Sequence, residues 1–459
     1  LGIMDLFGVL AIGLLGTLSI SGIQASEPSN KVSSILKIFG LSNSNFQTQI
    51  SIIGITAVVL LISRTFLSIF FTRKILYFMS YRGATISANL VSKFLAQPLL
   101  VVQRWSIQQA LFAVTRGVEI VALEVLALSV VLTADIALLA ILVIGLFVVD
   151  PLTSISTILI FGIVAAILHK LMHGKAGEIG SKSTELTIRS SEKVTEVFSS
   201  YRESVVRNRR DFYAREIAKT RFELAGYKAE IGFMPLIGKY VIETTLVIGA
   251  VSIGAIQFFM QDAAHAVATL AIFLAAGSRM APAVLRIQQG SILMKSSIGM
   301  AKPTLDLIEF LGNSRLVENM DDEVHTKHDG FKAEIDVVNV SLTYPEKFDK
   351  ALLNVSLKAS QGAVIAVVGS SGAGKTTLVD VLLGILEPDS GTVQISGVTP
   401  LEAISKWPGA IAYVPQDVLV TNGSIRENVA LGYPLEAATD ELVNDAIRIA
   451  SLAEFVATL

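Results

Sequence analysis

A short glycine-rich stretch of this 459-residue chain has the residue types and spacing that hold a phosphate group. Residues 369–376 read GSSGAGKT, which fits the pattern G-x-x-x-x-G-K-[ST]. Glycines let several backbone N–H groups approach one anion, and the lysine and hydroxyl that follow reach the outer phosphates and Mg²⁺. The stretch predicts a nucleoside triphosphate site formed by Gly369, Ser370, Ser371, Gly372, Ala373, Gly374, Lys375, Thr376 and Thr377.

The segments around this loop indicate the domain that positions it. The apolar run AVIAVVG leads into the loop and is typical of a buried strand, and a helix is predicted to begin at Gly374. Further short β-type runs read EIDVVNVSLTY, LLNVSLKA, TVQISG and AIAYVPQ. This alternation predicts an α/β domain over residues 331–459, preceded by a polar linker over 313–330.

The remainder of the chain has the composition of a membrane protein. The chain is 52% hydrophobic and 17% charged, with a mean hydropathy of +0.62, whereas soluble domains carry about 25% charged residues. A membrane-spanning helix needs about 20 apolar residues. Six such stretches are predicted, at Gly2–Gln24, Gln49–Phe71, Val118–Val149, Leu152–Leu171, Met234–Phe258 and Ala264–Val284, and their number and length exclude a soluble protein with buried core helices.

The charges between these stretches predict the orientation. Residues 73–117 contain six Lys or Arg residues and no acidic residue, and residues 170–240 contain 14 Lys or Arg residues. Since basic connections stay in the cytosol, both of these connections are expected there. The formal net charge of −2 gives no support for nucleic acid as a partner, and the lack of cysteine excludes disulfides.

Both basic connections are expected to be helical. Charged and apolar residues alternate at spacings of three and four with few helix breakers, which predicts helices that extend well beyond the bilayer. Bends are expected at 96–109, which contains Pro98, and at 199–215. Residues 1–312 are therefore predicted to form the membrane domain.

Two residues at fixed distances from Lys375 add a resemblance to a known family. Tyr344 lies 31 residues before this lysine in VSLTYP, and Gln416 lies 41 residues after it in IAYVPQD, shortly before SIRENVALG. This order resembles the nucleotide-binding domain of ATP-binding cassette (ABC) transporters. The resemblance implies that Tyr344 stacks on adenine, that Gln416 and Thr376 reach Mg²⁺, and that Lys375 and Gln416 act on the γ-phosphate and the attacking water.

The whole chain resembles an exporter-type ABC half-transporter, with six transmembrane helices followed by the ATPase domain. The resemblance implies ATP and Mg²⁺ as cofactors, coupling helices at the two bends, and a second half-transporter that supplies a signature loop in trans, most simply in a homodimer. It also implies a multi-pass protein of the bacterial inner membrane with its nucleotide-binding domain in the cytoplasm.

The substrate is expected to be a lipid, a lipid-linked glycan or another amphipathic molecule, with a drug or peptide as the alternative. Pro235, Tyr240 and Glu243, together with Arg279 and Pro282, loosely resemble patterns in bacterial lipid-linked oligosaccharide flippases. Charged residues within spans are costly and mark functional sites, which makes candidates of Arg64, Asp135, Glu243 and Arg279. The alternative is that the two arginines extend to the membrane surface, or pair with Glu243 to hold helices together.

A different class of function is also open, namely a membrane-tethered nucleotide-binding regulator or an ATP-gated channel. A signature loop of the LSGGQ type, and the aspartate and glutamate that follow it, would decide between this class and a transporter. None of them occurs in the sequence, which begins at Leu1 within an apolar run. We expect the sequence to be truncated at both ends, with an incomplete ATPase domain, and the 459 residues alone to bind nucleotide weakly without hydrolysing it.

Overall fold

The computed structural model describes residues 46–149, 151–260, 263–312, 314, 324, 327–345, 347–416, 418 and 420–459. These residues divide into two units. The first contains the described residues up to Lys93 and Ser106–Ser314, and the second contains Phe94–Trp105 and the described residues from 315 to 459. Residues 94–105, which the sequence assigns to the membrane domain, therefore group with the C-terminal unit.

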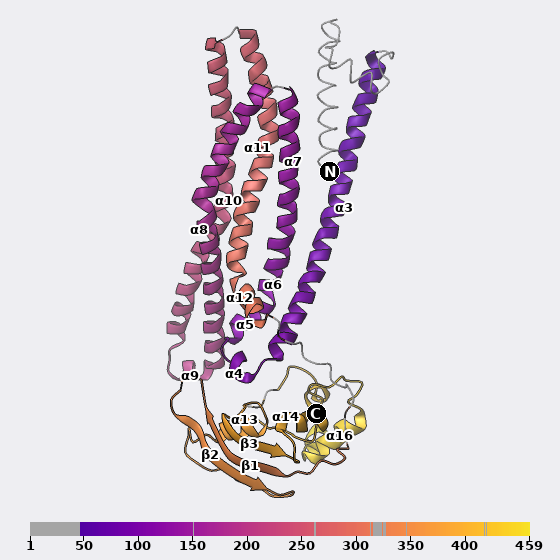
Figure 1. The fold of residues 1–459 in the computed structure, drawn as a ribbon, viewed down its shortest axis with the longest axis vertical. Coiled ribbons are helices and arrows are strands. Elements are labelled where there is room, and N and C mark those ends of the chain that lie inside the picture. The colour runs from indigo at the N-terminus through magenta and orange to yellow at the C-terminus, as the bar shows by residue number, and fades with distance from the viewer. Residues whose placement is uncertain are drawn as a thin grey trace. The chain divides into compact units, whose positions relative to one another are not determined.

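The first unit is helical (Figure 1). Its helices are α3 (Phe46–Leu95), α5 (Ile107–Val114), α6 (Arg116–Glu119), α7 (Leu128–Val149), α8 (Pro151–Ser199), α9 (Tyr201–Val206), α10 (Arg210–Met260), α11 (Ala263–Met300) and α12 (Lys302–Leu311). Between α6 and α7 the chain forms the π-helix η1 (Ile120–Ala127), a type of helix that is rare and often found at functional positions. Between Ser199 and Arg210, within the range 199–215, the long helices α8 and α10 are separated by the short helix α9 and the turns on either side of it.

Four helices among the described residues are long and apolar enough to cross a membrane, at Gln47–Leu95, Ile107–Ile144, Ile155–Ser199 and Arg210–Ile256. They overlap the second to fifth predicted stretches. The first stretch lies outside the described residues, and the sixth falls in α11, where many side chains are outside the described set. With 49 residues, α8 is about 74 Å long at about 1.5 Å per residue, far more than a bilayer core of about 30 Å requires.

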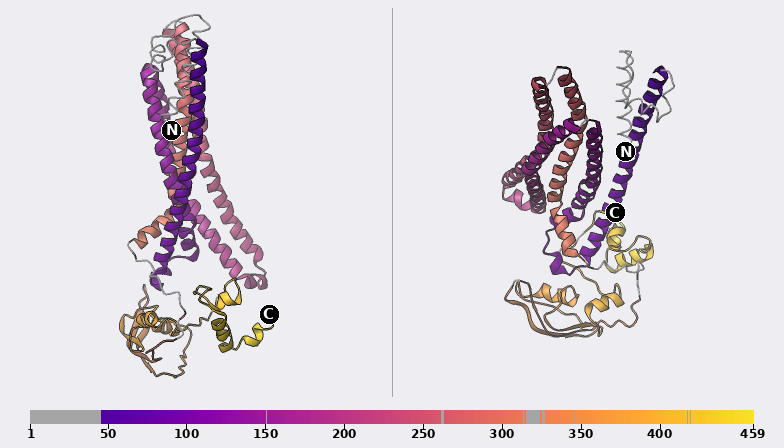
Figure 2. Two further views of the ribbon diagram at one scale, coloured as in Figure 1. Left: turned by 90° about the vertical axis from the view of Figure 1, so that its right-hand side faces the viewer. Right: turned by 45° about the horizontal axis from the view of Figure 1, so that its top comes forward.

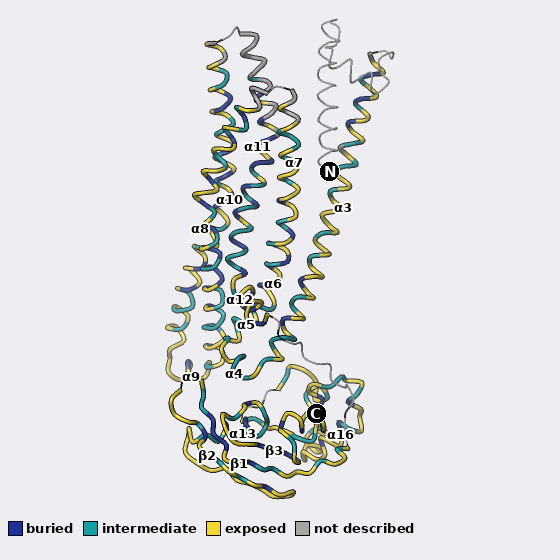
Figure 3. Tube along the Cα trace, in the orientation of Figure 1, coloured by how far each residue is buried: buried dark blue, intermediate teal, exposed yellow. Residues whose placement is uncertain are grey.

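Four helices of the first unit, α7, α8, α10 and α11, form a packed group. α8, α10 and α11 contact one another, and α7 packs on α11, an arrangement visible from three directions in Figures 1 and 2. One apolar core of the group joins α8, α10 and α11 through Leu168, Met172, Ala176, Ile179, Met234 and Ile292. By contrast, α3 carries large exposed side chains such as Phe66 and Phe70. Exposed positions recur along its trace in Figure 3. Exposed apolar faces of this kind are normal for helices that contact lipid.

Glycines bring the backbones of α8 and α11 together. A Cβ at Gly180 would overlap the carbonyl oxygen of Ser296 and lie 2.9 Å from its carbonyl carbon, and a Cβ at Gly299 would lie 3.0 Å from the carbonyl carbon of Gly177. Only residues without a Cβ permit such an approach. This contact fixes the crossing point of the two helices.

The second unit contains a small antiparallel sheet. Strands β1 (Ile335–Thr343), β2 (Lys350–Ala359) and β3 (Ser390–Ile395) lie in the order β2-β1-β3. The helices of this unit are α4 (Leu99–Val102), α13 (Lys375–Leu382), α14 (Pro400–Lys406), α15 (Ile425–Val429), α16 (Asp440–Ile449) and α17 (Ala453–Val456). Its main core joins the sheet to α13 and consists of Val337, Val340, Leu342, Leu352, Leu378, Val381, Leu386 and Val393.

Two of the predicted strands are absent from the described structure. AVIAVVG and AIAYVPQ have no strand pairing, and their side chains are largely exposed, with Val364 at 99%, Val368 at 88% and Val414 at 83%. A central strand needs a hydrogen-bonded neighbour on each edge. Neither run pairs with β1, β2 or β3 in the described structure, so the prediction of strands there is wrong for this structure.

The crossing of α8 and α11 can be tested with a matched pair of substitutions. Gly180→Ala is expected to lower the midpoint of thermal unfolding in detergent, because the new methyl group overlaps backbone atoms of α11, and overpacking of this kind costs about 1–3 kcal/mol. The control, Gly174→Ala on the same helix, meets no atom within 4 Å and should leave the midpoint unchanged or raise it. Equal midpoints for the two variants would contradict the close contact.

Candidate functional site

The predicted phosphate loop leads directly into α13, the helix that the sequence predicts there. Gly372 and Gly374 have φ angles of 83° and 84°, a backbone region that residues with a Cβ rarely adopt. A Cβ at Gly374 would also lie 3.2 Å from the Leu352 side chain. The loop therefore ends at the N-terminus of α13, where unsatisfied N–H groups and the helix dipole favour an anion.

Lys375, the first residue of α13, reaches back over the loop. Its Nζ donates hydrogen bonds to the carbonyl oxygens of Gly369 at 3.0 Å and Ser370 at 2.8 Å. Residues 370–373 of the loop are exposed. The ammonium group is thus already at the loop, where it can exchange two neutral carbonyls for phosphate oxygens and form stronger, charge-assisted hydrogen bonds.

The two threonines after this lysine have different surroundings. Thr376 is exposed, whereas Thr377 is buried and its Oγ1 lies 3.1 Å from Tyr344 Oη, within hydrogen-bond distance. Tyr344 follows β1 and packs against the core of the second unit. The structure therefore brings Tyr344 to the helix of the phosphate loop and leaves the Thr376 hydroxyl accessible. Both predicted roles, adenine stacking by Tyr344 and Mg²⁺ binding by Thr376, require a position beside the phosphate loop.

Gln416 lies in an irregular segment before α15. Its side chain is exposed and makes no hydrogen bond to another described residue. The segment after it is held by Asn428, whose Oδ1 accepts a hydrogen bond from the Thr421 backbone N–H at 2.8 Å. The role of Gln416 toward Mg²⁺ and water stays a prediction.

Three carboxyl groups of the second unit, Asp380, Glu402 and Glu427, have shifted pKa values, and hydrogen bonds from the Thr399 hydroxyl and backbone N–H lower the pKa of Glu402. Burial raises the pKa of Asp380, which lies on the same helix as Lys375. Hydrogen bonds from the Ser424 backbone N–H and hydroxyl lower the pKa of Glu427, and this pair forms the capping box that begins α15.

No group of three or more His, Cys, Asp or Glu residues among those described could hold a metal ion. The chain's own donors at the loop are hydroxyls and backbone groups. Such a set fits Mg²⁺ bound together with the phosphates of a nucleotide, since this ion commonly uses few protein ligands and keeps several waters.

The short helix α4 belongs to the same unit as the loop. Leu99 and Leu100 are partly buried and pack against the core that contains Leu378 and Val381 of α13. Residues of the predicted bend at 96–109 therefore share an apolar core with the helix that begins at Lys375. Because protein interiors are close-packed, a shift of α4 or α13 would displace the other helix as well.

The three predicted charged residues whose side chains are described, Arg64, Asp135 and Glu243, lie on different helices and form no contact with one another among the described interactions. Arg64 is partly buried on α3, Glu243 is exposed on α10 without an ion pair to a described residue, and the Arg279 side chain lies outside the described set. Asp135 on α7 accepts a hydrogen bond from Arg286 Nε on α11 at 2.9 Å. The sequence analysis missed Arg286 because it lies two residues beyond the last predicted stretch. Asp135 itself could have indicated this pair, because an acidic residue within a membrane span needs a charged or polar partner.

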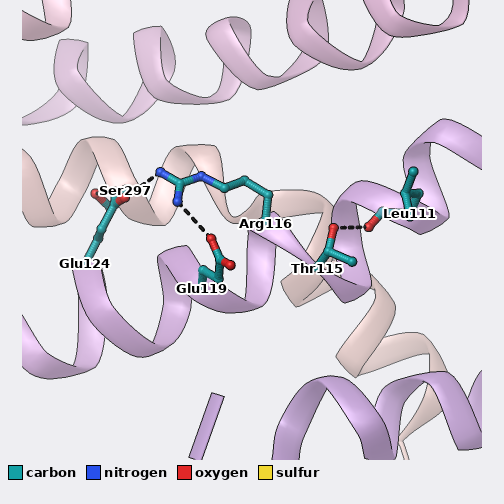
Figure 4. A network of polar contacts seen from close by, with 6 residues as sticks. All are labelled: Leu111, Thr115, Arg116, Glu119, Glu124 and Ser297. Carbon is teal, nitrogen blue, oxygen red and sulfur yellow. Dashed lines mark hydrogen bonds and ion pairs between the residues drawn. The ribbon is translucent and has the colours of Figure 1, made fainter. Parts of the chain in front are cut away.

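A second polar network, also missed, surrounds the start of η1 (Figure 4). Arg116 forms ion pairs with Glu119 at 2.9 Å and with Glu124 at 3.1 Å. Glu124 also accepts a hydrogen bond from the buried Ser297 hydroxyl of α11 at 3.0 Å. The π-helix thus carries the carboxylate that joins α6 to α11.

Comparison with known proteins identifies the class of the C-terminal segment. Residues 352–458 match the family model described as "ABC transporter". This segment contains the phosphate loop and α13 to α17. The chain therefore consists of a helical membrane-type domain followed by an ABC ATPase domain.

One relative extends the similarity beyond this segment. An ATP-dependent permease MDL1 of Candida albicans is 27% identical over 303 residues, which are 63% of this chain and 40% of the relative. An ATP-dependent lipid A-core flippase of Thiobacillus denitrificans is 39% identical over 105 residues, which are 23% of this chain and 18% of the relative. This chain thus spans less than half the length of these two relatives.

A solved structure, entitled "Structure of a bacterial Atm1-family ABC exporter with ATP bound", shares the fold with a TM-score of 0.65 at 15% identity. The match covers 99% of this chain and 77% of the chain in the solved structure. The predicted resemblance to exporter-type ABC half-transporters is confirmed.

The packing of α4 can be tested through the fluorescence of the second unit, which contains both tryptophans of the chain, Trp105 and Trp407. Replacing Leu99 and Leu100 together by alanine is expected to lower the free energy of unfolding of this unit by about 2 kcal/mol in a denaturant titration, the lower range for a buried leucine because both are only partly buried. Leu95→Ala is the control, since Leu95 is 69% exposed. An effect of the control equal to that of the double variant would contradict the packing.

Proposed function

We propose that this protein is an ATP-driven membrane exporter that moves its substrate by alternating access. In this proposal six transmembrane helices line the pathway, the two long basic connections lie in the cytosol, and ATP binding and hydrolysis change the access of the pathway from one side to the other. The proposal is supported by the ABC transporter match of residues 352–458 and by the spans among the described helices.

One observation carries the proposal, namely that α4 shares an apolar core with α13. The first of these helices lies in the connection between the second and third spans, and the second begins with the lysine of the phosphate loop. A regulator that only binds nucleotide needs no such contact. A transporter does, because the energy of nucleotide binding has to reach the membrane helices. We assign to Leu99 and Leu100 the transmission of this motion, and to residues 199–215 a second coupling contact.

The roles of the loop residues follow from the chemistry of their groups. Lys375 binds the β- and γ-phosphate oxygens, and the backbone of Gly369–Thr377 surrounds the phosphates. The exposed Thr376 hydroxyl and Gln416 hold Mg²⁺, and Gln416 orients the attacking water. The ring of Tyr344 stacks on adenine while its hydroxyl stays near Thr377.

The exporter works as a pair of half-transporters in this proposal. A single six-span half has one wall of a pathway, so a second copy supplies the other wall, and its signature loop completes the ATP site in trans. A homodimer is the simplest form. The bacterial inner membrane, with the nucleotide-binding domain in the cytoplasm, is the proposed location.

The proposed substrate is a lipid, a lipid-linked glycan or a similar amphipathic molecule. One relative acts as a lipid A-core flippase, and others are multidrug transporters, so a drug or peptide is the alternative. Arg64, Glu243 and Arg279 remain proposed cavity residues, and the Asp135–Arg286 pair joins them as a charged group between two membrane helices.

The nucleotide site can be tested by measuring the affinity of the protein for Mg-ATP, with a fluorescent ATP analogue as the probe. Lys375→Ala is expected to weaken binding by at least about tenfold, because hydrogen bonds to charged groups contribute about 1.5–3 kcal/mol. Lys358→Ala removes an equal charge from β2, where Lys358 faces Asp336 at 3.6 Å, and should leave affinity unchanged. If both variants bind Mg-ATP as the parent does, the loop is not the nucleotide site.

The role of Tyr344 can be separated from its hydrogen bond to Thr377 in the same assay. Tyr344→Phe retains the ring and is expected to keep most of the affinity for ATP, whereas Tyr344→Ala loses stacking, which contributes about 1–3 kcal/mol per base where it has been measured. Circular dichroism checks that both variants fold. Equal losses in the two variants would show that the hydroxyl, and not the ring, matters for binding.

A further inference from the structure

We propose that the first unit contains a binding site for one acyl chain of an anionic phospholipid, inside a single protomer. The site is a cavity of about 730 Å³ between α7, α8 and α11. Its membrane setting rests on the proposed function, whereas binding of a lipid there does not require ATP binding or hydrolysis.

The walls of the cavity have the shape of an elongated slot. Its lining extends over Ser129–Val143 of α7, Ile158–His169 of α8 and Met280–Met294 of α11. The 14 residue steps from Ser129 to Val143 correspond to about 21 Å at about 1.5 Å per residue, which is more than half of a bilayer core of about 30 Å. A slot of this length suits a single extended hydrocarbon chain better than a compact solute.

The polar residues of the lining gather at one end of the slot. α7 runs antiparallel to α8 and α11, so the low-numbered end of α7 lies level with the high-numbered ends of the other two helices. Ser129 and Thr133 of α7, His169 of α8 and Ser291 of α11 therefore lie toward one end. Leu139, Val143, Ile158 and Phe161 line the other end. The cavity has the polarity of an amphiphile with its head group at the polar end.

Basic groups continue from this polar end. The rings of His169 and His173 lie with their centroids 4.4 Å apart, and His173 Nδ1 is buried without a hydrogen-bond partner among the described residues. Lys295 lies over Gly177, one turn beyond His173, with its Cε 3.2 Å from the position of a Cβ there. An ammonium and two imidazoles favour an anionic head group, because phosphate oxygens accept hydrogen bonds from all three. By the distribution of basic residues, this end faces the cytosolic leaflet.

The cavity opens between α7 and α8, so a lipid can enter from the side. Thr133 and Ile136 of α7 and Gly162 and Ala166 of α8 line the cavity and are exposed. In Figure 1 the two helices converge where the chain passes from one to the other and diverge along their length, with α11 between them. Both helices are apolar enough to span a membrane. Water fills an apolar cavity poorly, and the hydrocarbon outside the opening is the available occupant.

Gly162 gives a direct way to close the slot. A Cβ at this position meets no atom within 4 Å, so a larger side chain can enter the cavity without displacing the helices. Gly174, on the same helix and outside the cavity, also meets no atom within 4 Å. Leucine favours helix over glycine at both sites. The two substitutions are therefore matched in chemistry and differ only in whether they fill the slot.

The test uses the full chain in vesicles of phosphatidylethanolamine and phosphatidylglycerol that contain a phosphatidylglycerol probe with a photoreactive diazirine in its palmitoyl chain. After irradiation, mass spectrometry should find adducts on the peptides that contain residues 129–143, 158–169 and 280–294. Gly162→Leu should reduce this labelling by at least about fivefold, Gly162→Ala should reduce it less, and Gly174→Leu should leave it unchanged. Equal labelling of Gly162→Leu and the parent, or adducts spread evenly over the lipid-facing helices, would overturn the proposal.

The head-group part has its own comparison. A phosphatidylcholine probe with the same palmitoyl chain should label the cavity at least about threefold less, because it lacks the net negative charge that His169 and Lys295 attract. Replacing both basic residues by alanine should abolish the difference. Equal labelling by the two probes in the parent would overturn the anionic assignment. Mg-ATP binding, measured on the same samples, distinguishes failure of this site from failure of the proposed function.

Discussion

The backbone contact between α8 and α11 is the constraint on which the helical unit depends. At Gly180 and Gly299 the two helices approach so closely that one added methyl group would meet main-chain atoms of the other. With α8 held against α11 and α7 packed on the other side of α11, a space remains between the three helices. The same helix pair therefore provides both the close backbone contact of the unit and two walls of the cavity between α7, α8 and α11.

The second unit depends on a different contact, between a phosphate loop and a small apolar core. α13 begins with Lys375, which reaches back to the loop, and continues with Leu378 and Val381, which enter the core. Leu99 and Leu100 enter the same core from a part of the chain more than 270 residues away in sequence. One helix of eight residues thus contacts both the candidate nucleotide site and the connection between two membrane helices. This arrangement gives the proposed coupling a physical route.

The features that could be predicted from sequence depend on neighbouring residues. The loop and the start of α13 followed from glycines at positions with φ near 84° and from the lysine beside them. The long helices followed from apolar and charged residues at helical spacing. Strands at AVIAVVG and AIAYVPQ were predicted wrongly, because a strand depends on partners that its own residues do not specify. Arg286 was missed for a similar reason, since its ion pair with Asp135 joins residues 151 positions apart.

The sequence by itself determined the class of the protein, because the phosphate loop, the apolar spans and the positions of Tyr344 and Gln416 are local patterns whose chemistry needs no distant contact. Only the tertiary structure decided which segments meet. It placed Tyr344 beside Thr377, joined the α4 leucines to the core of α13, and opened a slot between α7, α8 and α11. The physical reason is that packing depends on side-chain shape at contacts between distant residues, and periodicity along one helix does not specify the helix that will face it.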